Sequence, residues 1–423
     1  MSQKAVVLLP VIKTDTALRD PQSKLEEAVS LTKAIDLDVV HSEYFTVREI
    51  KPATYIGGGT IERLKEIISQ NQVDVVIMTT ALSPLQQRNL EKAWNTKVID
   101  KTALILEIFG QRARTKEGVL QVELAHLTYA RSRLVRSWTH LERQRGGSGF
   151  LGGPGETQIE LDRRLIDEDI VKIKKELEEV KKTRDLHRKA RKRVPFPIVA
   201  LVGYTNAGKS TLFNKLTKAD VFAQDLLFAT LDPTMRQVRL PNGQNIILSD
   251  TVGFISDLPT ELVMAFRATL EEVLEADVII HVRDYSHPDT HAQKEDVEQV
   301  LRGLGLDEQV NRGFLIEALN KIDMLDEDER QCVLNRSAHK SGQWPISAIS
   351  GQGLDDLLYA VQKQLMADYK KIFVRLPISD GAMLAAAYRK GEVLNRTDTD
   401  DYIDLEILVR PSDIATFDNF RYG

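Results

Sequence analysis

The 423-residue chain has a single cysteine, Cys332, so it cannot form an intrachain disulfide. This scarcity suits a reducing compartment and predicts a cytoplasmic protein. Aromatic residues are only 6% of the chain, and no apolar run approaches the ~20 residues that a membrane-spanning helix needs. The first residues enter an apolar segment at once and resemble neither a signal nor a transit peptide. We expect a monomer without a membrane span.

A strong net charge is also missing, because the whole chain carries only −5 at pH 7. The charge is unevenly distributed, however. Residues 112–193 contain 21 Lys/Arg and 13 Asp/Glu, which makes this segment +8 and leaves −13 for the remainder. The asymmetry predicts one basic segment attached to an acidic body. The length suggests roughly two to four domains.

Residues 1–115 alternate between strand and helix patterns, which predicts a small parallel α/β domain. The predicted strands are 5–9, 39–47, 73–78 and 97–99, and the predicted helices are 23–35, 60–70, 84–94 and 104–114. Gly57, Gly58 and Gly59 precede the second helix. They favour a tight loop with positive φ over a phosphate-binding loop, because a glycine cluster alone is weak evidence.

Residues 116–194 carry two heptad-like apolar patterns, which predict an antiparallel coiled helical hairpin. At 1.5 Å per residue its arms would be ~45 Å long. The predicted loop, residues 146–156, contains six glycines and Phe150. Arginines that can grip phosphates flank it, at positions 133, 136, 143, 145, 163 and 164. Phe150 can stack on an unpaired base, so RNA contact is favoured over a merely solvated turn.

The next predicted domain, residues 195–371, follows a basic linker and begins at Pro195 and Pro197, two prolines that mark a domain boundary. Its first strand, 198–202, leads into a G-x-x-x-x-G-K-S loop and then a helix. This order points free N–H groups and the positive end of a helix dipole at one spot, as phosphate binding requires. The nucleotide-binding residues predicted here are Gly203, Tyr204, Thr205, Asn206, Ala207, Gly208, Lys209, Ser210 and Thr211. Lys209 supplies a charge for the β- and γ-phosphates, and Ser210 a hydroxyl for Mg²⁺.

Four further motifs follow at the carboxyl ends of predicted strands, where open α/β sheets bind ligands. They comprise Phe228, Ala229, Thr230, Leu231 and Asp232; Asp250, Thr251, Val252 and Gly253; Asn320, Lys321, Ile322 and Asp323; and Ser347 with Ala348. Asp250 is expected to hold Mg²⁺ through water, and the Gly253 N–H to approach a γ-phosphate. Lys209, Thr230 and Gly253 are the predicted catalytic residues, and Ser210, Thr230 and Asp250 the predicted metal site.

The motif at Asp323 predicts guanine, because a buried carboxylate can accept from both N1–H and the 2-amino group, which adenine lacks. The Ala348 N–H is expected to donate to guanine O6. Phe254 stands where many GTPases place a water-orienting glutamine, and a phenyl ring cannot hydrogen-bond water. Slow intrinsic hydrolysis is therefore expected. His281, His287 and His291 fit structural roles better than a metal site.

These motifs, together with Gly152-Gly153-Pro154-Gly155-Glu156-Thr157-Gln158 and the run from Leu134 to Gln144, resemble the HflX family of translational GTPases. The resemblance covers about residues 1–370. It weakens in residues 372–423, which read as a small α+β domain with the order strand, helix, strand, helix.

The resemblance implies a GTPase that binds the 50S subunit, 70S ribosomes and large-subunit ribosomal RNA, and that splits ribosomes with its hairpin loop near the peptidyl transferase centre. It implies GTP as substrate, Ser210 and Thr230 as direct Mg²⁺ ligands, and Thr230 as the residue that senses the γ-phosphate. Asn206 suggests dependence on K⁺. An alternative function, a nucleotide-regulated RNA chaperone or helicase, stays open, because the family's first domain has been linked to ATP use and RNA unwinding.

Overall fold

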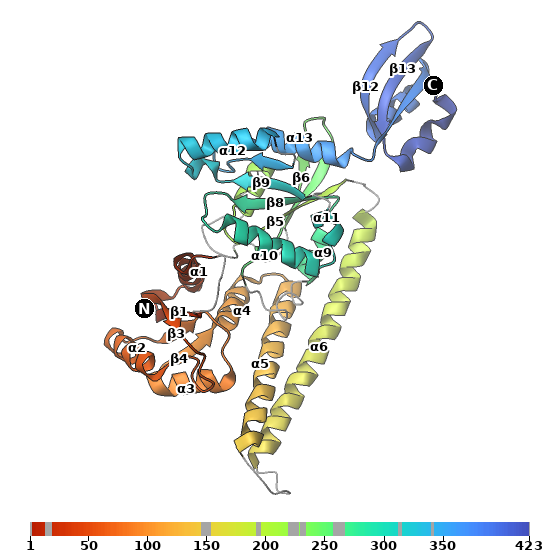
Figure 1. The fold of residues 1–423 in the computed structure, drawn as a ribbon. Helices are drawn as coiled ribbons and strands as arrows, with labels where there is room; N and C mark the ends of the chain where they lie inside the picture. The colour runs from red at the N-terminus through yellow and green to blue at the C-terminus, as the bar shows by residue number, and fades with distance from the viewer. Residues whose placement is uncertain are drawn as a thin grey trace.

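The structure is a computed structural model of the 423-residue chain. It describes residues 2–12, 19–144, 154–191, 196–218, 228, 234–256, 267–311, 315–339 and 342–422. Figure 1 shows four parts: an α/β domain at the N-terminus, a long helical hairpin, a central α/β domain and a small C-terminal domain. Among the helices of the described ranges, none is long and apolar enough to cross a membrane.

The first domain is a parallel four-stranded sheet with the order β2-β1-β3-β4. Side chains of its central strand alternate between two cores. Ala5, Val7 and Leu9 pack with α1 and α4, whereas Val6 and Leu8 pack with α2 and α3. The predicted small parallel α/β domain is therefore present, with helices on both faces of its sheet. Its elements are β1 (Lys4–Ile12), α1 (Pro21–Lys33), β2 (Asp38–Val47), α2 (Gly58–Asn71), β3 (Val75–Met78), α3 (Pro84–Trp94), β4 (Lys97–Asp100) and α4 (Lys101–Arg112).

The glycine cluster before α2 differs from the prediction. Gly57 is the N-cap of α2 with φ −74°, and Gly58 and Gly59 belong to the helix itself. None of the three has positive φ, and a Cβ added to any of them would meet nothing within 4 Å. The expected tight loop with positive φ was therefore wrong.

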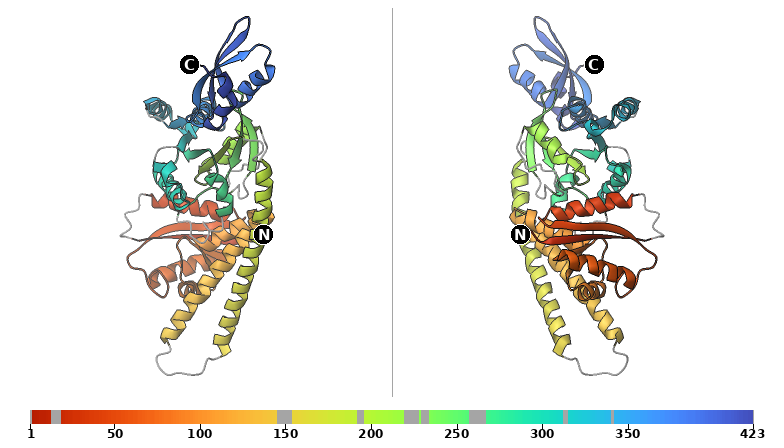
Figure 2. Two further views of the ribbon diagram at one scale, coloured as in Figure 1. Left: turned by 90° about the vertical axis from the view of Figure 1, so that its right-hand side faces the viewer. Right: turned by 90° about the vertical axis from the view of Figure 1, so that its left-hand side faces the viewer.

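The hairpin consists of α5 (Lys116–Gln144) and α6 (Pro154–Arg191), which run side by side and project beyond the first domain (Figures 1 and 2). The predicted loop was too long at its C-terminal end, because Pro154, Gly155 and Glu156 are already helical. Proline suits the first position of a helix, where its missing N–H has no helical partner. Residues 145–153, including Phe150, lie outside the described residues.

The central domain is built on a six-stranded sheet with the order β10-β9-β8-β5-β7-β6. All neighbouring strands are parallel except β6, which pairs antiparallel with β7. The strands are β5 (Ile198–Gly203), β6 (Thr234–Arg239), β7 (Asn245–Asp250), β8 (Val278–Asp284), β9 (Leu315–Asn320) and β10 (Gln343–Pro345). The helices are α7 (Lys209–Thr217), α9 (Arg267–Leu274), α10 (Thr290–Gly303), α11 (Asp307–Asn311), η1 (Ile322–Met324), α12 (Glu327–His339) and α13 (Leu354–Leu365).

The C-terminal domain lies at the opposite end of the molecule from the last turn of α5 (Figure 2). Its antiparallel sheet has the order β11-β13-β12, formed by β11 (Lys370–Pro377), β12 (Gly391–Asp398) and β13 (Tyr402–Val409). It is completed by α14 (Gly381–Lys390) and the 3₁₀ helix η2 (Pro411–Phe420). The sequence prediction missed β12, because this strand is polar and largely exposed and lacks the apolar alternation of its neighbour β13.

Candidate nucleotide site

The phosphate-binding loop connects β5 to α7 at the carboxyl edge of the central sheet. Gly203 (φ 155°) and Gly208 (φ 92°) adopt backbone conformations that favour glycine. A Cβ at Gly203 would collide with the Val282 carbonyl oxygen, and one at Gly208 with the Asn320 amide. The two glycines of the motif are therefore required by close packing as well as by backbone conformation.

Lys209 is the first residue of α7 and is buried. Its Nζ donates hydrogen bonds to the carbonyl oxygens of Gly203 (3.2 Å) and Tyr204 (2.8 Å). Burial lowers the pKa of Lys209 to about 8, against the opposing effect of the Asp250 charge. The ammonium group is thus held inside the loop by two carbonyl oxygens.

Ser210 and Asp250 lie together, as a shared metal site requires. The Ser210 hydroxyl donates to Asp250 Oδ2 at 2.7 Å, and Asp250 ends β7 in a fully buried position. A hydroxyl and a carboxylate are oxygen donors of the kind that Mg²⁺ prefers, and Mg²⁺ keeps several waters and phosphate oxygens as its other ligands. The two residues therefore fit the predicted ion.

The segment after Asp250 packs directly against the phosphate loop. Phe254 N donates to Gly203 O (3.1 Å), and Thr205 N donates to Phe254 O (2.7 Å). A Cβ added at Gly253 would lie 2.9 Å from Thr205 Cα and 3.0 Å from Lys209 Nζ. This glycine permits a close approach that no other residue allows. The Phe254 side chain is buried, with 1% exposed, so it turns away from solvent and orients no water.

The Asn320–Asp323 motif contacts the phosphate loop through Asn320. Its Nδ2 donates to Ala207 O at 2.8 Å, and its Oδ1 accepts from Ala348 N at 3.0 Å. The Ala348 N–H, which the sequence predicts to donate to guanine O6, donates to Asn320 Oδ1 in this structure, and its contact with guanine stays a prediction. Lys321 adopts φ 66° and pairs with Asp284 at 2.8 Å.

Asp323 lies in η1, and its side chain is exposed. The sequence prediction described a buried carboxylate, whereas the carboxylate is exposed in this structure. A bound base would have to cover it for the predicted burial to occur. Ser347 is buried beside Ala348, and its hydroxyl accepts from Ser350 N at 3.1 Å.

Of the predicted motif Phe228 to Asp232, called switch I below, the structure describes only Phe228. Ala229, Thr230, Leu231 and Asp232 lie outside the described residues. The Phe228 ring meets the ring of Phe109, a residue of α4 in the first domain, edge-on with centroids 4.7 Å apart. The first domain therefore anchors the chain two residues before Thr230.

Tyr204 carries an interdomain contact that the sequence did not reveal. Its hydroxyl donates to Glu27 of α1 at 2.5 Å and accepts from Ser256 N at 2.8 Å. Arg19 of the first domain also donates to this hydroxyl at 3.2 Å. Burial, with Glu27 nearby, raises the pKa of Tyr204 well above its usual range. A large aromatic side chain within a glycine-rich loop was the signal that could have indicated a contact here.

The three histidines do not form a cluster of ligands. His281 is buried in β8, where burial and then Arg283 lower its pKa to about 3. His287 Nδ1 accepts from Asp289 N at 3.0 Å. Within the described ranges no group of three His, Cys, Asp or Glu side chains is placed to hold a metal ion.

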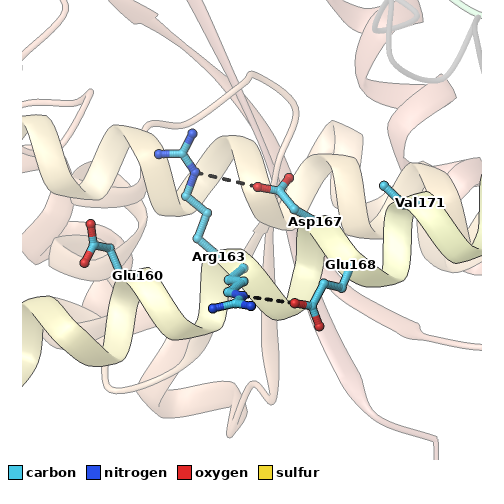
Figure 3. A pocket seen from close by; sticks show the side chains of 6 residues that line it. Glu160, Arg163, Asp167, Glu168 and Val171 are labelled. Carbon is cyan, nitrogen blue, oxygen red and sulfur yellow. Dashed lines mark hydrogen bonds and ion pairs between the residues drawn. The ribbon is translucent and has the colours of Figure 1, made fainter.

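The arginines near the hairpin loop fall into different environments. Arg133 is turned into the first domain, where it pairs with Asp100 at 3.2 Å. Arg163 and Arg164 line a shallow hollow on α6 and pair with Asp167 and Glu168, one turn further along the helix (Figure 3). The side chains of Arg136, Arg143 and Arg145 lie outside the described residues. Arg133 is therefore not available to grip RNA in this arrangement.

Comparison with known families gives four matches along the chain. Residues 22–110 match the family described as "GTP-binding GTPase N-terminal", and residues 112–191 match "GTP-binding GTPase Middle Region". Residues 198–321 match "50S ribosome-binding GTPase", and residues 332–419 match "HflX C-terminal domain". The last match corrects the expectation that the resemblance ends near residue 370.

Curated relatives are similar over most of their length. GTPase HflX of Magnetococcus marinus is 48% identical over 406 residues, which cover 96% of this chain and 92% of that protein. GTPase HflX of Escherichia coli is 42% identical over 365 residues, which cover 86% of this chain and 84% of that protein. Among solved structures, the SsGBP–GDP complex covers 86% of this chain and 99% of its own, with 24% identity and a TM-score of 0.48.

The central fold and its motifs define a P-loop GTPase, an enzyme that binds and hydrolyses GTP. The chain belongs to the HflX family, and its central domain is of the ribosome-binding GTPase type.

Proposed function

We propose that this chain hydrolyses GTP on the large ribosomal subunit and uses the cycle to split stalled or idle 70S ribosomes in the cytoplasm. The observation that carries the proposal is the convergence of Lys209, Ser210, Asp250 and Asn320 at one edge of the central sheet. Phosphate, metal and base recognition then occur within one continuous site.

Each residue has a proposed role that its contacts support. Lys209 exchanges its two carbonyl partners for β- and γ-phosphate oxygens, while the N–H groups of residues 206–211 bind the phosphates. The Gly253 N–H contacts the γ-phosphate, and Asp323 accepts from guanine N1–H and the 2-amino group. Ser347 and Ala348 complete the base pocket through Asn320.

Ser210, Asp250 and Thr230 would hold Mg²⁺, the first and last directly and Asp250 through water. When bound, this ion neutralises charge on the β- and γ-oxygens. Asn206 is exposed and adopts φ 59° at the mouth of the loop, a position from which its amide can also contact a monovalent cation such as K⁺.

Hydrolysis requires a side chain that orients water, and this chain has Phe254 where many GTPases carry that side chain. Phe254 occupies the position of a water-orienting residue, but its ring is buried and cannot hydrogen-bond water. We therefore infer low intrinsic turnover and strong stimulation by the large subunit, which orders switch I around Thr230.

The proposed ribosomal contact is the hairpin tip. The two helices that the loop connects extend away from the central domain (Figure 1), and the segment 112–193 is the basic part of an otherwise acidic chain. Its positive charge favours ribosomal RNA, and the projecting tip can enter a narrow cleft near the peptidyl transferase centre.

The test is steady-state phosphate release from GTP, with and without purified 50S subunits, in KCl and in NaCl. Stimulation by roughly 10²-fold or more is expected, with no activity from Ser210→Ala under either condition. A second assay measures co-sedimentation of the protein with 50S and 70S particles in the presence of GTP, GDP or a non-hydrolysable GTP analogue. Fast turnover without ribosomes would contradict the proposal. ATP-dependent strand separation that survives Asp323→Asn would favour the RNA chaperone instead.

A further inference from the structure

Three parts of the chain meet at two consecutive residues, Asp100 and Lys101. Asp100 is the last residue of β4 and the N-cap of α4, and its carboxylate accepts from Ala103 N at 2.9 Å. Lys101 is the first residue of α4. β4 is fixed in the sheet by pairing with β3, so both side chains project from one rigid turn.

Asp100 binds the hairpin. Tyr129 of α5 donates to its Oδ1 at 2.9 Å, and Arg133, one turn further along, donates to its Oδ2 at 3.2 Å. The Asp100 side chain is only 2% exposed and that of Arg133 18%. Arg133 also donates to Gln87 and Leu82 O in the first domain. The middle of α5 cannot rotate or slide without breaking these buried, charge-assisted bonds.

Lys101 binds the segment that follows Gly253; residues 253–256 are called switch II below. Its Nζ donates to the Ser256 hydroxyl at 2.8 Å and pairs with Glu27 at 3.3 Å. Ser256 donates from its own hydroxyl to Glu27 at 3.1 Å and from its backbone N–H to the Tyr204 hydroxyl at 2.8 Å. The network thus runs from α5 to the phosphate loop without a gap, through Arg133, Asp100, Lys101, Ser256 and Tyr204.

Local helix energetics do not explain the lysine. A cation in the first turn of a helix opposes the helix dipole, typically at a cost of about 0.3–1 kcal/mol. Lys101 is also largely buried, with 15% of its side chain exposed. Its contacts with Glu27 of α1 and with Ser256 offset both costs, so its location is explained by these two partners and not by α4.

We propose that the Asp100-Lys101 turn couples the hairpin to the nucleotide site, with Lys101 as a positioning residue for switch II. A partner that grips the hairpin shifts Arg133 and Tyr129 against Asp100, and the same turn then moves Lys101 against Ser256, three residues from Gly253. Coupling of this kind is reciprocal, so the bound nucleotide also alters the hold on the hairpin. The part of this inference in which the ribosome is the partner rests on the proposed function. The coupling between the hairpin and the nucleotide site can be measured in the free protein.

The first experiment is a double-mutant cycle on the full chain without ribosomes. Affinities for GDP and for a non-hydrolysable GTP analogue are measured for Arg133→Met, Lys101→Met and the double variant. Each single variant should change the ratio of the two affinities by about threefold or more, and the double variant by no more than either alone. Arg63→Met and Lys97→Met, both at exposed positions in the first domain, are the matched controls. Additive effects, or an unchanged ratio, would overturn the coupling whether or not ribosomes stimulate the enzyme.

The second experiment uses 50S subunits. Lys101→Met should still co-sediment with 50S subunits. Its stimulated kcat should fall at least about tenfold, with little change in KM for GTP. Lys101→Arg should restore most of the stimulated kcat. Full stimulation of Lys101→Met would exclude the positioning role. An absence of stimulation in the wild-type protein would instead count against the proposed function, and the nucleotide cycle would still decide the coupling.

Discussion

The side-chain amide of Asn320 donates to the carbonyl oxygen of Ala207 at 2.8 Å, across 113 residues of sequence. The same side chain accepts from Ala348 N at 3.0 Å. One amide therefore joins the phosphate loop, the Asn320–Asp323 motif and the Ser347–Ala348 loop. Because all three are buried against one another at this point, the base pocket and the phosphate loop are positioned as a unit.

Asp323→Asn should lower the affinity for GTP by at least tenfold. Two hydrogen bonds from guanine to a carboxylate are worth about 1.5–3 kcal/mol each, and an amide can accept only one of them. The variant should gain affinity for xanthosine triphosphate, whose C2 oxygen can accept from the new amide. Competition titrations with both nucleotides measure this change, with Asp326→Asn, at the nearby α12 N-cap, as control. Unchanged GTP affinity would remove Asp323 from the base pocket.

Gly253→Ala should separate GTP binding from GDP binding. The new Cβ would lie 2.9 Å from Thr205 Cα and 3.0 Å from Lys209 Nζ, so switch II must move away from the phosphate loop. Affinity for a GTP analogue and the hydrolysis rate should fall at least tenfold, whereas GDP, which lacks the γ-phosphate, should bind within a few-fold of normal. Gly303→Ala, with nothing within 4 Å of the added carbon, is the control. Equal losses for both nucleotides would mean that the substitution damages the whole loop.

Nucleotide affinity should fall as pH rises through the pKa of Lys209. Burial lowers this pKa to about 8 in the empty site, and phosphates require the charged form. From pH 7 to pH 8.5 the dissociation constant should therefore rise about fourfold, and binding at pH 8.5 should take up protons. Calorimetry in two buffers of different ionisation enthalpy measures the uptake. Lys215→Met, a change at an exposed lysine in α7, should leave the slope intact, and a flat profile for the wild type would contradict the assignment.

Replacing residues 146–153 with a short polar linker should leave GTP affinity intact and abolish ribosome splitting. The helices that this loop connects, α5 and α6, extend away from the central domain (Figure 1), so its loss should affect ribosome contact and not nucleotide binding. Light scattering of 70S particles measures subunit release, and nucleotide titration of the same variant is the control. Normal release would show that the glycine-rich tip is merely a turn.

The sequence by itself determined the central site, because its chemistry is local. Gly203 and Gly208 permit the loop, Lys209 and Ser210 begin the helix, and Asp250 and Asn320 each end a strand. Apolar periodicity likewise predicted the strands of the first domain and the two long helices, since burial on one face leaves a repeating pattern. It failed at β12 and at Gly57–Gly59, where polar or glycine residues carry no such pattern.

Only the tertiary structure decided how the parts act on one another. The contacts of Tyr204 with Glu27, and of Lys101 with Ser256, join residues 177 and 155 positions apart. The sequence predicted that Arg133 contacts RNA, but its side chain is turned inward and donates to Asp100. A charged side chain has the same local sequence whether it faces solvent or a buried partner. Its environment depends on which distant segment the packing of α1, α4 and α5 brings beside it, and no periodicity along the chain records that choice.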